Sequence, residues 1–371
     1  MEFRITQRDL LKGLSRIQAI VEKRNTMPIL ANTLIEADGD KVFISATDLE
    51  IGIRGGYGAT VLRKGSATIS ARKLFEITRE LPSDENITIR TGENNYVEIT
   101  CAKINFKLVG LPPEEYPGLP KGEEKSLAQI ESAALLEMIE RTLYAVSTDE
   151  ARYNLNGVYL ETKPEEGLLR MAATDGHRLA LVDRKIEGVD LSKFDKGVIV
   201  PKKGINELKR LLEEDDEPVK IGFKKGHAVV KKKDVLLVNR LIDGTFPDYE
   251  QVIPKDLNKT LTVPREPLLA SLKRVSVLAK ERSGSVKLEL GNNQLVISST
   301  NPDLGEAREE IEVTYTGETL TIGFNARYLL EAVASMDAKD VRLSFNDELS
   351  PGRVCPASDE STIAIVMPMR I

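Results

Sequence analysis

Apolar residues follow two different periods along this chain, and the two periods succeed each other in a regular order. Within residues 10–21 the apolar positions recur at spacings of 4, 3 and 4, which indicates an amphipathic helix with one buried face. Segments such as KVFISAT (41–47) alternate with a period of two and are rich in Ile, Val and Thr, as strands are. The pattern therefore predicts helices set among several short strands.

Three sets of similar motifs indicate that this order of patterns occurs three times. Thr47, Thr174 and Thr300 each follow an alternating apolar segment, and they are separated by 127 and 126 residues. Amphipathic segments in the same register are SARKLFEITRELP (70–82), VPKKGINELKRLL (200–212) and FNARYLLEAVASM (324–336). A further set of helical segments opens each repeat. Agreement of the sets in one register indicates a triplicated chain.

The repeats define the expected fold class and domains. Each repeat, about 125 residues long, reads strand, helix, several strands, helix and several strands. This order favours an α+β fold made of three tandem repeats, each with two helices on one face of an antiparallel sheet. Proline-rich, charged linkers lie at 112–126 and 246–259. We therefore expect domains at 1–125, 126–255 and 256–371.

Charged residues are divided unevenly between the predicted helices and the loops. The net charge of −6, taken alone, argues against nucleic acid as a partner. The helices are nevertheless rich in Lys and Arg, as at Arg8, Lys12 and Arg16, whereas acidic residues gather in loops such as EEDDE (213–217). A basic helix face is either a solvated surface or one that faces phosphates. Because no motif for reading base edges accompanies it, any DNA contact is expected to be independent of sequence.

Candidate catalytic chemistry is confined to the segment AATDGHRLAL (172–181). Asp175 lies two positions before His177, and such a pair could serve acid–base catalysis. The first repeat has Asp48 at the same position without a histidine, so a turn formed by the aspartate is the alternative interpretation. With two histidines, two cysteines and no common catalytic or metal-binding motif, the sequence favours a protein that is not an enzyme and needs no metal or other cofactor.

The expected location follows from the first residues and from the apolar runs. MEFRITQRDLLKG (1–13) alternates and carries charges, unlike a secretory signal. No apolar run reaches the roughly 18 residues of a membrane span. The two cysteines are typical of a reducing compartment. We expect a cytoplasmic protein with no membrane partner.

Further motifs, distributed over the whole chain, carry a resemblance to a known family. They are RNTMPILANTLIEA (24–37), ATDLEIG (46–52), FKLVGLPPEEYPGLP (106–120), ATDGHRLA (173–180), FPDYEQVIP (246–254) and VMPMRI (366–371). In this order they resemble the bacterial DNA polymerase III beta subunit, the sliding clamp family. The resemblance implies a DNA clamp fold of three similar domains and a head-to-tail homodimer that closes as a ring around duplex DNA.

The resemblance also implies partners and the residues that meet them. The ring would hold the catalytic subunit of DNA polymerase III, the clamp loader and other proteins with a clamp-binding motif on DNA, without sequence specificity. The positions that match DNA-facing residues are Arg24, Arg72, Lys73, Tyr153, Lys202 and Lys203. The positions that match the dimer interface are Phe106, Leu108, Val277 and Leu278. Asn154 departs from a family pattern that often has a second aromatic residue here.

A docking pocket for partner peptides is implied between the second repeat, the third repeat and the C-terminal tail. The matching positions are Leu155, Thr174, Gly176, His177, Arg178, Leu179, Pro247, Val252, Leu349, Val366, Met367, Pro368, Met369 and Arg370. Pro368 cannot donate to a sheet and marks the point where the tail strand leaves it. Met367 and Met369 are flexible side chains suited to varied apolar peptides. Gln251 stands where some family members have a basic residue.

Two other functions stay open on the residues alone. One is a scaffold of three repeats that binds peptides and never meets DNA. The other is a hydrolase or transferase that uses Asp175 and His177.

Overall fold

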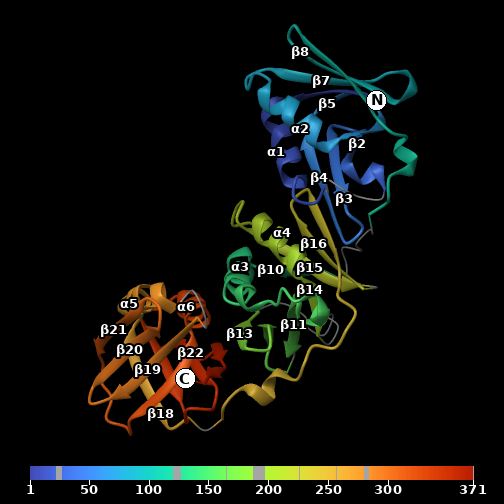
Figure 1. Cartoon of the computed structure of the whole chain (residues 1–371). Helices are drawn as coiled ribbons and strands as arrows, with labels where there is room; N and C mark the ends of the chain where they lie inside the picture. Colours follow the sequence, from blue (N-terminus) through green and yellow to red (C-terminus); the bar gives the residue numbers. More distant parts are fainter. Residues whose placement is uncertain are drawn as a thin grey trace. The chain divides into compact units, whose positions relative to one another are not determined.

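The computed structural model describes residues 1–21, 27–119, 127–163, 165–186, 197–224, 226–255, 257–279 and 284–370 (Figure 1). It divides into two compact units. Unit 1 comprises Met1–Ser132 and Asn206–Leu241, and unit 2 comprises Ala133–Ile205 and Ile242–Ile371. Among the described residues, no helix is both long enough and apolar enough to cross a membrane.

Unit 1 contains two antiparallel sheets. The five-stranded sheet has the order β5 (Thr60–Arg63), β1 (Glu2–Thr6), β7 (Asn86–Thr91), β8 (Tyr96–Cys101) and β9 (Ile104–Val109). The eight-stranded sheet has the order β10 (Ala128–Ile130), β15 (Val219–Lys224), β16 (His227–Lys232), β17 (Val235–Arg240), β4 (Ile51–Gly58), β3 (Lys41–Thr47), β2 (Asn32–Asp38) and β6 (Gly65–Ser70). The second sheet thus joins strands of the first and second repeats.

Unit 2 is built in the same way. Its eight-stranded sheet has the order β14 (Val198–Pro201), β11 (Gly157–Lys163), β12 (Leu168–Thr174), β13 (Arg178–Lys185), β25 (Thr362–Val366), β24 (Gly352–Pro356), β23 (Asp340–Phe345) and β18 (Lys259–Pro264). Its five-stranded sheet has the order β21 (Gly305–Glu312), β20 (Gln294–Asn301), β19 (Ser285–Gly291), β22 (Leu320–Asn325) and β26 (Pro368–Met369). The larger of these two sheets joins the second and third repeats.

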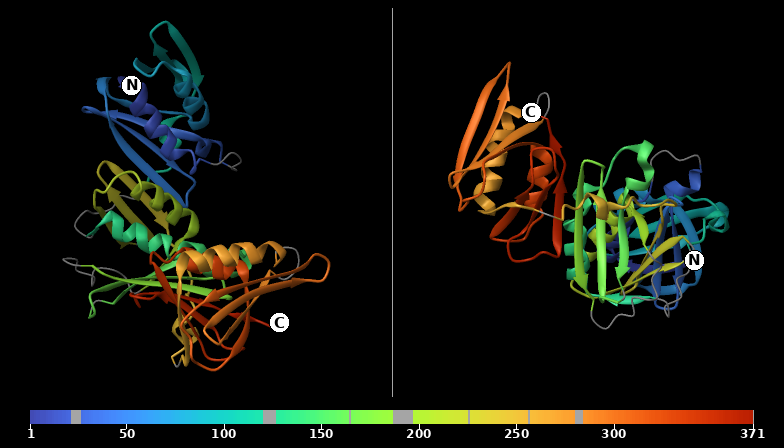
Figure 2. Two further views of the ribbon diagram at one scale, coloured as in Figure 1. Left: turned by 90° about the vertical axis from the view of Figure 1, so that its left-hand side faces the viewer. Right: turned by 90° about the horizontal axis from the view of Figure 1, so that it is seen from below.

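The helices pack in pairs within the units. In unit 1, α1 (Gln7–Ile17) and α2 (Ala71–Glu80) lie against each other, and α1 also packs on β3 and β4. In unit 2, α5 (Arg265–Ala279) and α6 (Ala326–Ala334) form the equivalent pair, on one side of their strands in Figure 2. The helices α3 (Ser132–Glu140) and α4 (Lys202–Leu212) belong to the second repeat. The element order strand, helix, strands, helix, strands therefore occurs three times, as the sequence predicts.

The first helix begins and buries one face as its sequence indicates. Thr6 Oγ1 accepts a hydrogen bond from the Asp9 N–H at 3.1 Å and so caps the helix. Leu10, Leu14 and Ile17 are buried in the core. The helix ends at Ile17, earlier than the apolar pattern suggests.

Two repeats meet at one antiparallel strand pair in each eight-stranded sheet, and we call this pair a junction. In unit 1 the junction is β4 with β17, where Gly52 lies opposite Val238. In unit 2 it is β13 with β25, where Leu179 lies opposite Ile365. Gly52 and Leu179 each lie five residues after the repeated threonine, so both junctions have the same register. Main-chain hydrogen bonds thus join neighbouring repeats in the same way twice.

A buried lysine holds the end of α4 in unit 1. Lys232, on β16, is 3% exposed, and its Nζ donates to the carbonyl oxygens of Leu211, Leu212 and Asp215 at 3.0, 3.2 and 2.6 Å. A helix C-terminus leaves such carbonyls without partners and attracts positive charge. The Asp215 carboxylate lies 3.2 Å from the same Nζ. Hydrogen bonds from Lys233 and Lys232 lower the pKa of Asp215 to about 2, although desolvation opposes them.

Replacing Lys232 with methionine should destabilise unit 1. The methionine retains the apolar stem, but the helix carbonyls lose their donor, so we expect a loss of about 2–4 kcal/mol in the free energy of unfolding. Urea denaturation followed by circular dichroism measures this loss. The control is Lys220→Met, on the exposed side of the neighbouring strand β15. An equal effect of both substitutions would contradict the assigned role of Lys232.

Candidate functional site

An apolar cavity of about 220 Å³ lies in unit 2, beside the junction of β13 and β25. It is lined by Leu155, Thr174, Gly176, Arg178, Leu179, Pro247, Asp248, Tyr249, Val252, Ile365 and Met367. Most of the residues that line the cavity have aliphatic or aromatic side chains, and only a few contribute polar groups. Such a cavity suits an apolar side chain presented by a ligand.

The segment Thr174–Arg178 forms one wall of the cavity as a tight turn between β12 and β13. Thr174 Oγ1 donates to the Arg178 carbonyl at 2.6 Å and accepts from the Gly176 N–H at 3.1 Å. Asp175 Oδ1 accepts from the N–H groups of His177 and Arg178 at 2.9 and 3.1 Å. Gly176 has a φ of +88°, which favours glycine. The Asp175 carboxylate therefore organises the turn through the backbone, instead of orienting the His177 ring.

The first repeat has the same turn chemistry without the histidine. Thr47 Oγ1 donates to the Ile51 carbonyl at 2.9 Å, and Asp48 Oδ1 accepts from the Ile51 N–H at 2.6 Å. The interpretation of Thr-Asp as a shared turn motif is confirmed by these bonds. Leu49 in the first repeat has a φ of +77°, and the second repeat has a glycine, Gly176, at the equivalent position.

The side chain of Arg178 is buried beneath the turn. It is 7% exposed and pairs with Asp175 at 3.0 Å and with Glu331 on α6. Its Nη2 donates to the Tyr144 carbonyl at 2.6 Å, and its guanidinium lies 4.4 Å from the centre of the Tyr328 ring. The sequence predicts Arg178 as a residue of the docking pocket, available to a ligand. In the structure its charge is instead satisfied by the protein, and it fixes the turn to the third repeat.

The linker that follows the second repeat forms the opposite wall. Phe246 stacks on Tyr159 with ring centres 4.7 Å apart, and Tyr249 packs edge-on against both rings. The Tyr249 hydroxyl donates to Glu161 Oε2 at 2.8 Å. Burial is the main cause that raises the pKa of the Tyr249 phenol, which keeps this hydroxyl a neutral donor. These contacts hold Pro247 and Val252 in place beside the cavity.

The C-terminal tail closes the third side. The Met367 N–H donates to the His177 carbonyl at 2.9 Å, and the side chain is 37% exposed. The tail leaves the sheet of β25 before Pro368, as predicted, and then pairs with β22 of the other sheet, Pro368 opposite Phe324. The tail therefore ties the two sheets of unit 2 together at the cavity.

The structure gathers part of the predicted peptide site and separates the rest. Predicted residues that line the apolar cavity are Leu155, Thr174, Gly176, Arg178, Leu179, Pro247, Val252 and Met367. Predicted residues outside its lining are His177, Leu349, Val366, Pro368, Met369 and Arg370. Val366 is buried in the core, and Leu349 is 67% exposed on the loop between β23 and β24. The sequence missed Asp248, Tyr249 and Ile365, although the FPDY motif and the alternation of the tail contain them.

His177 belongs to a neighbouring polar cavity of about 340 Å³. This cavity shares Arg178 with the apolar one and also includes Arg152, Lys202 and Tyr328. The rings of His177 and Tyr328 lie 6.5 Å apart and are tilted. Within the described residues, no group of three or more His, Cys, Asp or Glu side chains could hold a metal ion.

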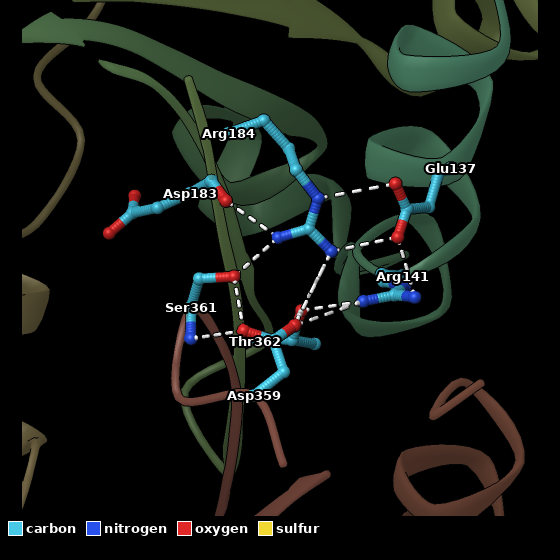
Figure 3. Close-up of polar contacts among 7 residues, drawn as sticks. All are labelled: Glu137, Arg141, Asp183, Arg184, Asp359, Ser361 and Thr362. Atoms are coloured by element: carbon cyan, nitrogen blue, oxygen red, sulfur yellow. Dashed lines mark hydrogen bonds and ion pairs between the residues drawn. The ribbon is translucent and has the colours of Figure 1, made fainter. Parts of the chain in front are cut away.

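An ion-pair network connects α3 with the junction of β13 and β25 (Figure 3). Arg184 Nη2 lies 2.7 Å from Glu137 Oε1, and Arg141 lies 2.5 Å from the same carboxylate. Arg141 Nη1 also donates to Thr362 Oγ1 at 2.7 Å. Donation from Arg184 is the largest cause that lowers the pKa of Glu137. Through Arg184, which also donates to Ser361 Oγ at 2.5 Å, the network connects the second repeat with the turn before β25.

The predicted DNA-facing residues lie on two helices and one short helical turn. Arg72 and Lys73, in the first turn of α2, are 62% and 65% exposed, and both pair with Glu76. Lys202 and Lys203 open α4. Tyr153 is 58% exposed on the 3-10 helix Glu150–Leu155, where Asn154 donates to the Thr245 carbonyl. Arg24 lies outside the described residues.

One basic helix residue is engaged within the protein. Arg16 pairs with Glu214 and donates to the Tyr57 hydroxyl at 2.9 Å, so it does not form a free basic face with Arg8 and Lys12. Its partners lie far away in the sequence, which the periodicity of α1 could not reveal.

The predicted interface residues lie on an edge strand and at the end of a helix. Phe106 is 39% exposed and Leu108 is half-buried on the edge strand β9. Val277 is 62% exposed and Leu278 is half-buried at the end of α5. Exposed apolar side chains beside an unpaired strand edge indicate a surface suited to a further chain.

Replacing Arg178 with alanine should destabilise unit 2 by about 3–5 kcal/mol, because Asp175 and Glu331 would lose a buried countercharge. Chemical denaturation measures the loss. Arg327→Ala is the control, since Arg327 is exposed on the same helix as Glu331, and its expected effect is within about 0.5 kcal/mol. If Arg178→Ala left stability unchanged, the buried network would not be structural.

Comparison with known proteins covers the whole chain. Family models described as the N-terminal, central and C-terminal domains of the DNA polymerase III beta subunit match residues 1–120, 129–248 and 250–370. The chain is 36% identical to the beta sliding clamp of Caulobacter vibrioides over 381 residues and 33% identical to that of Escherichia coli over 372 residues, with all of each chain covered.

Solved structures of similar proteins have the same fold. The DNA polymerase III subunit beta of Pseudomonas aeruginosa matches with a TM-score of 0.94 at 35% identity, with all of both chains covered. A sliding clamp from the same organism bound to griselimycin matches equally well, with a TM-score of 0.94 at 35% identity and full coverage of both chains. With three family models and full-length relatives in agreement, this chain belongs to the DNA polymerase III beta subunit family, the beta sliding clamps, and has their three-domain fold.

Proposed function

We propose that two copies of this chain close head to tail into a ring around duplex DNA and hold the replicative polymerase and other partners on it. In this role the chain catalyses no reaction and acts as a processivity factor. The observation that carries the proposal is an unused third junction. The described part of the chain contains two junctions between repeats, and the strands equivalent to a third pair lie at sheet edges in the first and the last repeat.

The strands equivalent to a third junction pair are β9 and β21, each of which has one free edge among the described residues. The hairpin of β8 and β9 pairs Cys101 with Ile104, as that of β16 and β17 pairs Lys232 with Val235, so β9 corresponds to β17. β21 follows Thr300 as β4 follows Thr47, so β21 corresponds to β4. Both lie at the edges of their five-stranded sheets.

Transfer of the internal register gives a specific pairing between two chains. Where β17 meets β4, Val238 lies opposite Gly52 and Leu236 opposite Arg54. The equivalent positions place Lys107 of one copy opposite Gly305 of the other, and Asn105 opposite Ala307. A contact between different surfaces of identical chains closes a ring when the rotation fits, and here it would remove both exposed edges.

Charge and apolar surface favour this pairing. The strand β21, with the sequence GEAREEIE, has an excess of acidic residues, whereas Lys107 is the charged residue of β9. Exposed apolar side chains lie on or beside these edges: Ile104, Phe106, Val109, Val277 and Leu304. A second copy would shield them from water.

DNA contact in the proposed ring is electrostatic and independent of sequence. Arg72, Lys73, Lys202 and Lys203 lie in the first turns of their helices, and we propose that they face phosphates together with Arg24 and Tyr153. Such contacts are screened by salt and carry no base information, which permits sliding. Retention would come from ring closure.

Partner proteins would dock in the apolar cavity of unit 2. We propose that a short apolar motif of the polymerase, the clamp loader or other partners enters it, with the neighbouring polar cavity and the tail residues Met369 and Arg370 as its surroundings. The relative bound to griselimycin supports ligand binding by this fold. The alternative, a peptide scaffold without DNA, gives no reason why β9 and β21 correspond to the two strands of an internal junction.

Substitution of Phe106 with aspartate should separate the proposed dimer. The wild-type chain is expected at about twice 41.1 kDa by light scattering, and Phe106→Asp at 41.1 kDa, because a carboxylate would be buried at the interface. Leu62→Asp, on the opposite edge of the same sheet and 52% exposed in the wild type, is the matched control. A monomeric wild type at micromolar concentration would contradict the ring.

Charge reversal of Arg72, Lys73, Lys202 and Lys203 should shorten the products of processive synthesis. The salt dependence of DNA association should also fall, by about 0.9 in log–log slope for each phosphate that is no longer neutralised. A control that reverses Lys64, Lys185, Lys220 and Lys339 has the same net charge. Equal behaviour of the two variants would favour a scaffold that never meets DNA.

A further inference from the structure

The apolar cavity has a negatively charged rim. Between Arg240 and Lys255 the linker carries Asp243, Asp248 and Glu250 and no basic residue. Of these three, Asp248 lines the cavity and is exposed. The linker therefore contributes negative charge directly beside the position of a docked apolar side chain.

The charge of Asp248 is not neutralised by the protein. Its Oδ2 accepts a hydrogen bond from Gln251 Nε2 at 2.8 Å, which is a contact with a neutral group. Within the part of the chain that the structure describes, Asp248 makes no ion pair with a lysine or arginine. The carboxylate is thus available to a charge on the ligand.

The charged groups behind the cavity do not supply the missing positive charge. The one cation in the lining, Arg178, is matched by two carboxylates, Asp175 and Glu331. Behind Tyr249, Arg170 and Lys163 pair with Asp183 and Glu250, and a third carboxylate, Glu161, lies opposite Arg170 on the neighbouring strand and accepts from the Tyr249 hydroxyl. The adjoining polar cavity adds Arg152, Lys202 and Arg327 on the side of Arg178, so the uncompensated negative charge of the apolar cavity is confined to the linker side, where Asp248 lies.

We propose that this docking site prefers partner motifs with a basic residue beside the apolar anchor, and that Asp248 determines this preference. The inference rests on the proposed peptide-docking function and specifies the chemistry of its ligands. A lysine or arginine next to the anchor gains an attractive contact, whereas an acidic residue there meets a carboxylate of like charge. The contact lies at an exposed rim, so its contribution is modest and sensitive to salt.

The experiment uses fluorescent decapeptides with a Leu-Leu anchor in a Gly/Ser background. Lysine, glutamine or glutamate is placed either before or after the anchor, and binding to the full-length dimer is measured by fluorescence anisotropy. At one of the two flanks we expect lysine to bind more tightly than glutamine, and glutamine more tightly than glutamate, by about two- to fivefold per step. The preference should shrink in about 0.5 M salt, a condition chosen to shorten the screening length.

Two isosteric variants assign the preference to one side chain. Asp248→Asn should abolish the difference between the lysine and glutamate peptides, whereas Asp243→Asn, in the same linker but outside the cavity lining, should leave it intact. Equal binding of all peptides by the wild type, or a preference that survives Asp248→Asn, would overturn the inference while leaving peptide docking in place. Failure of every peptide to bind, or binding that an excess of unlabelled Leu-Leu peptide does not displace, would overturn both.

Discussion

Antiparallel pairing between strands of neighbouring repeats is the interaction on which the rest of this structure depends. One repeat alone would leave strand edges with unpaired N–H and C=O groups. At both junctions a strand near the end of one repeat, β17 or β25, pairs with a strand in the first half of the preceding repeat. The same register occurs at both junctions. Because the same strand pairing occurs twice within the chain, one strand equivalent to β17 and one equivalent to β4 remain at sheet edges. These are β9 and β21, which we propose pair with a neighbouring copy.

The junction also creates the apolar cavity. Because β13 and β25 come from different repeats, their pairing brings the Thr174–Arg178 turn, the linker and the tail to one place. Buried ion pairs then hold these pieces: Arg178 connects the turn to α6, and Arg184 connects β13 to α3. Polar groups that are fully paired in this way specify one arrangement and leave the cavity itself apolar.

The sequence was sufficient for the parts of the fold that depend on local pattern. The order of helices and strands, the Thr6 cap and the Thr-Asp turns follow from periodicity and from side chains that bond their own backbone within a few residues. Most of the residues that line the cavity lie at positions that the family motifs predicted. The sequence could not identify partners that are distant along the chain. Arg16 meets Glu214, Lys232 holds the end of α4, and Arg178 meets Glu331, and nothing in the local pattern of a basic residue distinguishes these buried roles from a solvated one.

The proposed ring around DNA would explain how an acidic chain can work on a polyanion. Basic residues are needed only where the duplex passes, and weak screened contacts suffice because closure, rather than affinity, prevents escape. The most direct test is the lifetime of the chain on DNA after loading by its clamp loader. On a nicked circle the protein should stay bound for long periods at a salt concentration that abolishes ordinary binding, and cutting the circle once should release it rapidly. Equal lifetimes on the circular and the linearised DNA would contradict topological retention and with it the proposed ring.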